Sequence, residues 1–363
     1  MIQEIDAILS FLWAFVVTVF AIPSIVYVAH LKNLLDEPDH RRLHDSLTPR
    51  LGGLAIFAGF MSAITIFGDV TSSIQRTLAS VLILFFIGLK DDVVSISAFK
   101  KFFVQILATG IVMFLGDIRI ANFYGFLGLY ELPEGISYGF TFLVITGITN
   151  AINLIDGLDG LAGIIITIIM GTFGFYFFMY GGPDFAPYAK LCFCLMGAVV
   201  GFLRYNIKNA IIFMGDTGSL VCGFLVAITA IKFIDMQGMG LDNTPSLAIG
   251  ILVIPIFDTM RVFSLRILNG RSPFSPDKNH IHHVLKRAGL SQLAVVITLA
   301  TINVGVIVLM NLCRPMGDTF LIGILAALFI GCTLLIEFYQ PVNKQFEAQK
   351  LEHNQQLEME AKA

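Results

Sequence analysis

The stretch TNAINLIDGLDGLAG, residues 149–163, ends a long apolar run with a row of polar side chains. The row, spaced at steps of three, is Asn150, Asn153, Asp156 and Asp159. Residues three apart are neighbours on a helical surface, and polar groups at membrane depth usually mark function. Oxygen ligands of this kind suit a hard cation such as Mg²⁺ and the phosphates it accompanies. The alternative is helix termination with Gly157 and Gly160 as breakers, but termination needs only one such polar residue.

The composition around this stretch indicates a membrane protein. Of the 363 residues, 56% are hydrophobic and 13% are charged, whereas soluble domains carry about 25% charged residues. The five cysteines lie in or beside apolar runs without a CxxC pair, so we expect them to pack as small apolar side chains. The sequence therefore predicts an all-α polytopic membrane protein, and no nucleic-acid partner is expected.

Eleven apolar segments approach the length of roughly 20 residues that a membrane-spanning helix needs. They are 6–31, 52–69, 76–90, 102–117, 138–153, 160–181, 187–205, 218–235, 246–268, 292–312 and 318–338. We therefore predict about eleven transmembrane helices in a single integral membrane domain, residues 1–338. The polar segment 339–363 follows as a cytoplasmic tail, to which we assign no role.

The basic residues predict the orientation of these helices. Loops on one side hold 18 of the 23 Lys and Arg residues, and the positive-inside rule places that side in the cytoplasm. The N-terminus is then outside and the C-terminus cytoplasmic. The longest outer loop, near 117–137, has Gly125 and Gly128 between aromatic flanks, so we expect a small external hairpin there.

All the polar clusters fall on the predicted cytoplasmic side, which indicates one active site. The clusters are 36–53, 90–101, 149–163, 204–220 and 272–289. In the second, Asp91 and Asp92 can bind a metal-phosphate or accept a proton, although a solvated helix end is the alternative. Lys101, ten residues later, can grip a phosphate or serve as an anchor at the membrane surface.

The segment FMGDTGS, residues 213–219, is a second strong signal. Its glycines permit close backbone approach, Asp216 offers a carboxylate to a cation, and a helix N-terminus favours anions. An ordinary capped turn is the alternative. In the first cytoplasmic loop, the basic side chains can face an anionic substrate or only the lipid surface. These are Arg41, Arg42, His44 and Arg50.

Three histidines, His280, His282 and His283, lie between basic residues. Their spacing can hold zinc, but no Cys partner or HExxH helix accompanies them, and imidazole with ammonium groups favours phosphate binding. A basic loop near anionic headgroups is the alternative. Upstream, Asp258 and Arg261 follow a proline, which predicts a kinked helix; the kink can open a groove for a lipid substrate or reflect packing alone.

Together these clusters provide what phosphoryl transfer requires: a metal to neutralise charge, cations to clamp a diphosphate, and carboxylates. A membrane transporter is the competing function class. Transporter sites lie near the bilayer midplane, often with repeat symmetry, whereas here the polar clusters gather at one face and no repeat of fixed period is evident.

The motifs resemble those of the polyprenyl-phosphate N-acetylhexosamine-1-phosphate transferases. They are KDDV at 90–93, NAINLIDGLDGLAG at 150–163, FMGDTGSL at 213–220 and HIHH at 280–283. The likeness extends over residues 32–290, and the loop 272–289 is similar to the WecA-like branch, which makes undecaprenyl-diphosphate-GlcNAc. The phospho-MurNAc-pentapeptide branch typically has three consecutive histidines, and PRLGGLAIF at 49–57 also departs from its pattern.

The resemblance implies transfer of an N-acetylhexosamine-1-phosphate, GlcNAc-1-phosphate first, from a UDP-sugar to undecaprenyl phosphate with release of UMP. This is the initiating step of a cell-surface glycan such as lipopolysaccharide. It also implies Mg²⁺ or Mn²⁺ as cofactor, a homodimer, contact with membrane lipid, and an active site on the cytoplasmic face of the bacterial inner membrane. Phospho-MurNAc-pentapeptide, GalNAc and FucNAc remain alternative sugar groups.

The resemblance also assigns roles to residues. The metal set is Asn153 and Asp216, and the catalytic set is Asp91, Asp92 and Asp156. The substrate-binding set, with Phe213 as a stacking face for uracil, is Lys101, Asn150, Asp159, Asn206, Phe213, His280, His282 and His283. The family position of Asp91 is often assigned to deprotonate the lipid phosphate. Since a phosphate monoester has a second pKa near 6, our hypothesis is that Asp91 mainly organises the metal and lysines.

Overall fold

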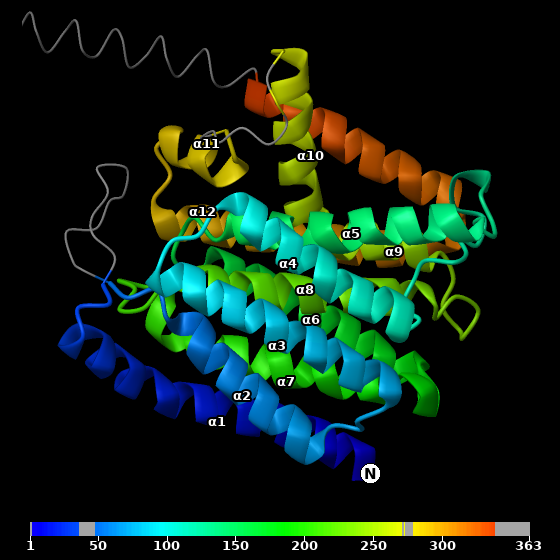
Figure 1. The fold of residues 1–363 in the computed structure, drawn as a ribbon. Coiled ribbons are helices and arrows are strands. Elements are labelled where there is room, and N and C mark those ends of the chain that lie inside the picture. Colours follow the sequence, from blue (N-terminus) through cyan, green and yellow to red (C-terminus); the bar gives the residue numbers. More distant parts are fainter. Residues whose placement is uncertain (1, 36–47, 271, 273–278, 338–363) are drawn as a thin grey trace, which may run out of the picture.

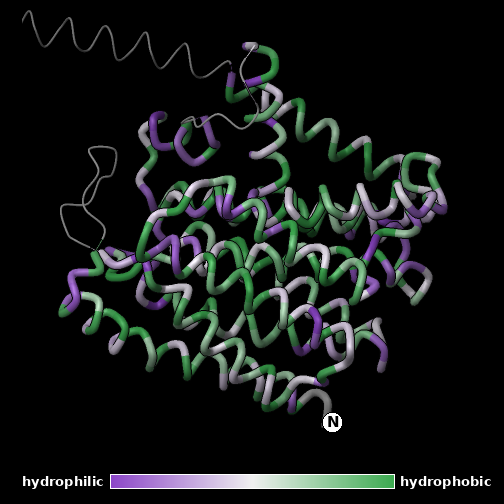
Figure 2. The backbone as a smooth tube through the Cα atoms, in the orientation of Figure 1, coloured by the Kyte–Doolittle hydropathy of each residue, from purple (hydrophilic) through white to green (hydrophobic). Residues whose placement is uncertain are grey.

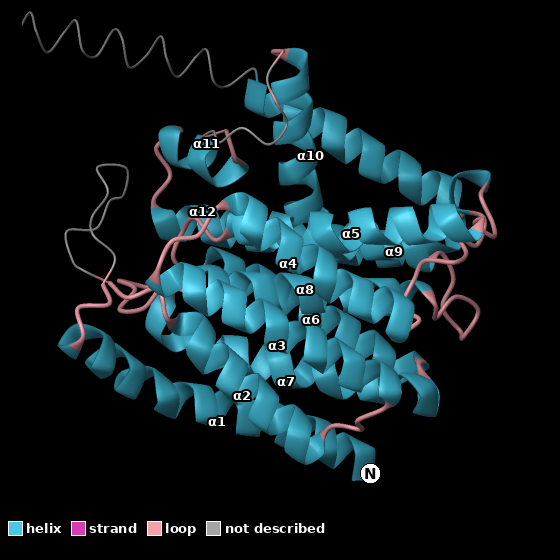
Figure 3. Ribbon diagram, in the orientation of Figure 1, coloured by secondary structure: helices cyan, strands magenta, loops and turns pink. Residues whose placement is uncertain are grey.

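The computed structural model describes residues 2–35, 48–270, 272 and 279–337. The predicted tail 339–363 and the basic residues Arg41, Arg42 and His44 lie outside the described residues. Within the described ranges the chain is helical between its loops, with no β-strand, as Figure 3 shows.

The helices follow one another along the chain, as labelled in Figure 1. They are α1 (Ile2–Leu31), α2 (Gly52–Phe67), α3 (Ser72–Val93), α4 (Ala98–Gly110), α5 (Glu134–Ile155), α6 (Leu161–Tyr180), α7 (Gly182–Asn206), α8 (Gly215–Ile234), α9 (Thr244–Ile251), α10 (Val253–Leu268), α11 (Ile281–Arg287) and α12 (Gln292–Cys313). A further helix, Asp318–Glu337, follows α12.

The helices confirm the all-α polytopic membrane class. Nine helices of the described chain are long and apolar enough to cross a membrane, and the bent pair α9–α10 makes a tenth if it is one span. The apolar helix α2 has only 16 residues. Figure 2 shows apolar residues along nearly all of these helices. The count of eleven spans and the orientation of the chain stay predictions.

Helix α8 lies at the centre of the bundle and contacts α2, α3, α5 and α6. All of its residues from 217 to 231 are buried. A helix that is apolar on all sides avoids water by being surrounded with other helices. The sequence of α8 has this character from Leu220 to Ile231, after its polar first turn. The polar first turn of α8 therefore begins at the end of the buried core.

The chain turns by 78° between α9 and α10. The break is at Leu252, three residues before Pro255. Proline lacks an N–H group, and its ring collides with the carbonyl four residues earlier, here that of Ile251, so a straight helix cannot continue through this point. The predicted kink is present, and α10 stands apart in direction from α5 and α8 (Figure 1). A cavity of about 60 Å³ lies between α10, α12 and the helix Asp318–Glu337.

The loop between α4 and α5 forms the predicted hairpin. Asn122 and Glu131 make an isolated antiparallel bridge, and the Phe123 amide donates to the Tyr130 carbonyl at 3.0 Å. Gly125 adopts φ 90° at the turn, a conformation that glycine accepts without steric cost. The hairpin is confirmed, while its location outside the membrane stays a prediction.

Candidate active site

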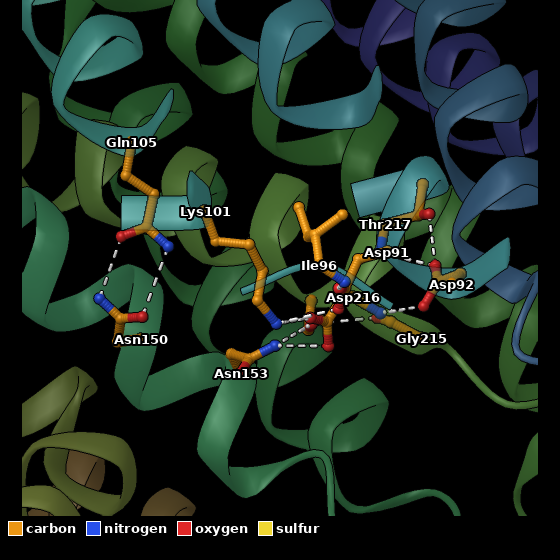
Figure 4. Close-up of polar contacts among 11 residues, drawn as sticks. Asp91, Asp92, Ile96, Lys101, Gln105, Asn150, Asn153, Gly215, Asp216 and Thr217 are labelled. Carbon is orange, nitrogen blue, oxygen red and sulfur yellow. Dashed lines mark hydrogen bonds and ion pairs between the residues drawn. The ribbon is translucent and has the colours of Figure 1, made fainter. Parts of the chain in front are cut away.

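Two carboxylates share one lysine where α3, α4 and α8 meet. The Lys101 ammonium donates to Asp91 Oδ2 at 2.9 Å and to Asp216 Oδ2 at 2.5 Å. Figure 4 shows the three side chains converging from separate helices. Charge-assisted hydrogen bonds of this kind are roughly twice as strong as neutral ones, so Lys101 firmly binds a residue that is 115 positions further along the sequence.

Asn153 completes this group from α5. Its Nδ2 donates to Asp216 Oδ1 at 3.2 Å and to Ser219 Oγ at 2.7 Å. The same asparagine therefore contacts the first turn of α8 at two points. We refer to the group below as the acidic centre; its members are Asp91, Asp92, Lys101, Asn153 and Asp216.

Asp92 points away from its neighbour Asp91 and caps the N-terminus of α8. Its carboxylate accepts from the Asp216 amide at 2.7 Å, the Thr217 amide at 2.9 Å and the Thr217 hydroxyl at 2.5 Å (Figure 4). The first amides of a helix lack hydrogen-bond acceptors within the helix. Here the Asp92 carboxylate, from α3, is the acceptor for two of them. Asp92 thereby sets the position from which Asp216 projects.

The acidic centre depends on the close approach of α2 and α8. A Cβ atom on Gly53 would lie 2.1 Å from the Gly218 amide nitrogen, so only glycine fits at this contact. Main-chain hydrogen bonds accompany this contact. The Gly52 amide donates to the Phe213 carbonyl and the Gly53 amide donates to the Met214 carbonyl, both at 2.8 Å. The segment 49–53 thus fixes the backbone that enters α8.

The polar row 150–159 divides where α5 ends at Ile155. Asn150 and Asn153 belong to the helix, Asp156 is its C-terminal cap and Asp159 lies in the following loop. The prediction of a single helical row is therefore wrong for its last two members. The chain leaves the helical path through a loop in which Gly160 adopts φ 79°, so the breaker alternative describes this end of the row.

Asn150 pairs with an amide that the sequence reading overlooked. Its Nδ2 donates to Gln105 Oε1 at 3.1 Å, and Gln105 Nε2 donates back to Asn150 Oδ1 at 3.4 Å. Gln105 is buried and lies one helical turn after Lys101, on the same face of α4 (Figure 4). The amide pair joins α4 to α5 beside the acidic centre.

Asn206, at the end of α7, fixes the loop that contains Asp159. Its Oδ1 accepts from the Gly160 amide at 2.7 Å, and its Nδ2 donates to the Ile212 carbonyl at 2.9 Å. Asp159 is buried in this loop. Phe213 is half-buried, with its amide bonded to the Pro49 carbonyl at 2.9 Å. These bonds connect the end of α7 to the loop of Asp159 and to the segment that leads into α8.

His280 and His282 of the histidine segment, residues 280–283, lie in different environments. His280 Nδ1 lies 2.8 Å from Asp258 Oδ2. His282 is buried beside Gly157, where a Cβ atom would lie 2.6 Å from its Nε2. Burial, and secondarily the neighbouring charge of His283, lowers the pKa of His282 to about 3, so this imidazole is neutral at physiological pH. Within the described residues, no three His, Cys, Asp or Glu side chains are placed to ligate one metal ion, which leaves the zinc alternative without a ligand set there.

Sequence reasoning missed Gln105 and Gly53 as contributors to this site, and it assigned Ser219 only to the cap of a helix. Gln105 carried one usable signal, since it is a lone amide four residues after Lys101 in an apolar run. The contacts of Gly53 and Ser219 join helices that are distant in sequence, and no local pattern predicts them.

Comparison with known proteins places the chain in a family. Residues 74–234 match the model of glycosyl transferase family 4. A Bacillus subtilis protein named "Probable undecaprenyl-phosphate N-acetylglucosaminyl 1-phosphate transferase" is 32% identical over 80% of both chains. Undecaprenyl-phosphate alpha-N-acetylglucosaminyl 1-phosphate transferases of Yersinia pestis and Escherichia coli K12 are 32% and 30% identical over 74% and 75% of both chains. The chain therefore belongs to glycosyl transferase family 4, and it is a multi-pass membrane enzyme of the sugar-1-phosphate transferase type that its motifs resemble.

Proposed function

We propose that the protein transfers GlcNAc-1-phosphate from UDP-GlcNAc to undecaprenyl phosphate. An oxygen of the acceptor phosphate bonds to the β-phosphorus of the donor, the bond from that phosphorus to the bridging oxygen breaks, and UMP leaves. The proposal is carried by the acidic centre, in which one lysine and two carboxylates from separate helices meet. The names of the relatives support the choice of donor sugar and acceptor lipid.

The acidic centre fits a divalent cation, Mg²⁺ or Mn²⁺. Asp91 and Asp216 lie close enough to share one ammonium group, so the position between them favours positive charge. Mg²⁺ is usually bound by one or two carboxylates together with water and substrate phosphates. Asp216 and Asn153 would hold the ion, with the carboxamide of Asn153 turned to present its oxygen. The bound cation would neutralise charge on the transferred phosphate.

Lys101 has a second role in this proposal. Its side chain reaches both carboxylates, and a divalent ion at Asp216 would compete with it for the same oxygens. An ammonium group turned toward the diphosphate of the donor would oppose the charge that develops on the leaving UMP. A lysine that can pair with either a carboxylate or a phosphate would offset negative charge in the site both before and after the substrate binds.

Asp91 acts in this scheme as an organiser of the centre. Its Oδ1 accepts from the Ile96 amide at 2.7 Å and its Oδ2 from Lys101. Both oxygens already have donors, and the acceptor phosphate is mostly a dianion at neutral pH. These facts favour a carboxylate that fixes Lys101 over one that removes a proton from the lipid phosphate.

The site is expected to face the cytoplasm of a bacterial inner membrane, because 18 of the 23 Lys and Arg residues belong to loops on that side. The water-soluble donor would then enter from the cytoplasm and the lipid acceptor from the bilayer. A homodimer, which the family resemblance implies, is part of the same proposal.

The test uses membranes that contain the full chain, undecaprenyl phosphate, Mg²⁺ and labelled UDP-GlcNAc. We expect UMP release and transfer of label to the lipid phase, both abolished by Asp216→Ala and by chelation of the metal. If another UDP-N-acetylhexosamine reacts in place of UDP-GlcNAc, the reaction stands and the sugar changes. No UMP from any of these donors, in a folded preparation, would favour the transporter alternative.

A further inference from the structure

A buried carboxylate on α10 holds the start of the histidine segment. The side chain of Asp258 is 1% exposed. Its Oδ2 lies 2.8 Å from His280 Nδ1, and its Oδ1 accepts from the Ile281 amide at 2.7 Å. Since the carboxylate can only accept, the proton of this contact is on His280 Nδ1. The two oxygens of the Asp258 carboxylate therefore bind two consecutive residues, His280 and Ile281.

Arg261, about one turn further along α10, bonds to Asn279, the residue that precedes His280. Arg261 is 4% exposed. Its Nη1 donates to the Asn279 carbonyl at 2.8 Å, and its Nη2 pairs with Glu337 Oε1 at 2.8 Å. The guanidinium group thus joins the entry of the histidine segment to the end of the last described helix. Asp258 and Arg261 are three residues apart, so both project from one face of α10.

The histidine segment contacts the loop that carries Asp156 and Asp159. The rings of His280 and His282 stack with centroids 5.9 Å apart and an interplanar angle of 13°. His282 is 1% exposed and lies directly against Gly157. A continuous chain of contacts therefore runs from Asp258 through His280 and His282 to Gly157.

We propose that Asp258 and Arg261 are positioning residues of the transferase, which hold the histidine segment so that His282 rests on Gly157 and confines the loop of Asp156 and Asp159. The 78° break at Leu252 gives α10 the direction from which these side chains reach the segment. Partners of this indirect kind orient the residues that meet the substrate. The inference deepens the proposed function and rests on it.

The first test disturbs the chain of contacts at its two ends. Asp258→Asn removes the charge that pairs with His280, and Gly157→Ala places a methyl group 2.6 Å from His282 Nε2. We expect kcat/KM for UDP-GlcNAc to fall about tenfold or more in each variant. The two effects should be less than additive in the double variant, because both displace the same ring. Arg261→Gln should act in the same direction.

Gly147→Ala is the matched control, since a Cβ atom on this α5 glycine meets nothing within 4 Å. It should keep wild-type kcat/KM. The free energy of unfolding in Asp258→Asn and Gly157→Ala should fall by less than the loss of kcat/KM corresponds to, because the atom that must shift in Gly157→Ala is the end of a side chain. Losses that are fully additive, or that accompany an equal loss of thermal stability, would show general damage to the fold and overturn the proposal.

The second test does not depend on transferase activity. Amide hydrogen exchange of the full chain in detergent should quicken over residues 156–160 and 280–287 in Asp258→Asn, and not in Gly147→Ala. Unchanged exchange in both segments, or faster exchange throughout the chain, would refute the positioning role even if the transferase assignment holds. If no UDP-sugar reacts, the proposed function fails while the exchange result still decides this inference.

Discussion

The acidic centre and the histidine segment are built in different ways, although both belong to one site. The carboxylates of the acidic centre project from α3 and α8, whose backbones touch: a Cβ atom on Gly88 of α3 would lie 2.5 Å from the Thr217 Cα atom of α8. The histidine segment is instead held by side chains of α10, chiefly Asp258 and Arg261. Backbone contacts inside a packed core change little without wider rearrangement. The first half of the site is therefore set by the fold, and the second by a few polar bonds that can be altered separately.

The largest effect is expected at the lysine of the acidic centre. Lys101→Met leaves Asp91 and Asp216 facing one another without the ammonium group that now bridges them. We expect kcat/KM to fall by about a hundredfold or more, the size seen when a preorganised donor is removed. Lys101→Arg should recover part of the loss. Steady-state UMP release measures both, and a change in Lys101→Met of less than about threefold would contradict the assignment.

The backbone contact that supports the acidic centre can be broken without touching a polar group. Gly53→Ala places a Cβ atom 2.1 Å from the Gly218 nitrogen, so α2 and α8 must separate. Overpacking of this kind costs about 1–3 kcal/mol of stability, and a displacement of about 1 Å can lower activity about a hundredfold. Thermal unfolding and kcat/KM should fall together, unlike in Asp258→Asn. Wild-type behaviour in Gly53→Ala would mean that the two helices are not fixed as described.

The pH dependence of Asp91→Asn separates two roles of this carboxylate. As an organiser of Lys101, Asp91 is needed at every pH, and activity should fall about tenfold at both pH 6 and pH 8.5. As a base, it would be needed mainly near pH 6, where part of the acceptor phosphate still carries its second proton. Recovery of activity at pH 8.5 would therefore favour the base. Profiles of kcat/KM for undecaprenyl phosphate give the answer.

The smallest effect is expected at a buried lysine outside the site. Lys190 is 8% exposed and contacts Asp69 Oδ2 at 3.0 Å and Asp6 Oδ2 at 3.5 Å. Its partners are partly exposed, so Lys190→Met should cost about 1 kcal/mol of stability or less. Activity should stay within about twofold of wild type. A larger loss of kcat/KM, measured by UMP release, would show that removing a lysine from between two carboxylates lowers activity even outside the acidic centre.

The sequence predicts the class of fold well because membrane helices must be long and apolar. It predicts less about where each helix ends. Steps of three placed Asn150 and Asp159 in one row, but α5 ends at Ile155 and the row divides. Glycines in the loop allow the chain to leave the helix, and their conformations depend on contacts with α7 that spacing does not reveal.

Local sequence also groups residues that the fold separates. His280 and His282 belong to one motif, yet the first pairs with Asp258 and the second lies against Gly157. Asp91 and Asp92 are adjacent, but the first holds Lys101 and the second caps α8. Neighbours in sequence point in different directions on a helix, so a motif predicts that a site exists more reliably than it predicts the task of each member.

The cap that Asp92 places on α8 has a consequence for biosynthesis. Its donors are the amides of residues 216 and 217, the first of them 124 positions further along the chain. When α3 leaves the ribosome these donors do not yet exist, so the Asp92 carboxylate must remain hydrated at the membrane surface until α8 arrives. The reactive centre of this enzyme therefore assembles late, after most of its membrane helices have been made, and a nascent chain that lacks α8 carries the motifs at 90–93 and 150–163 without the site.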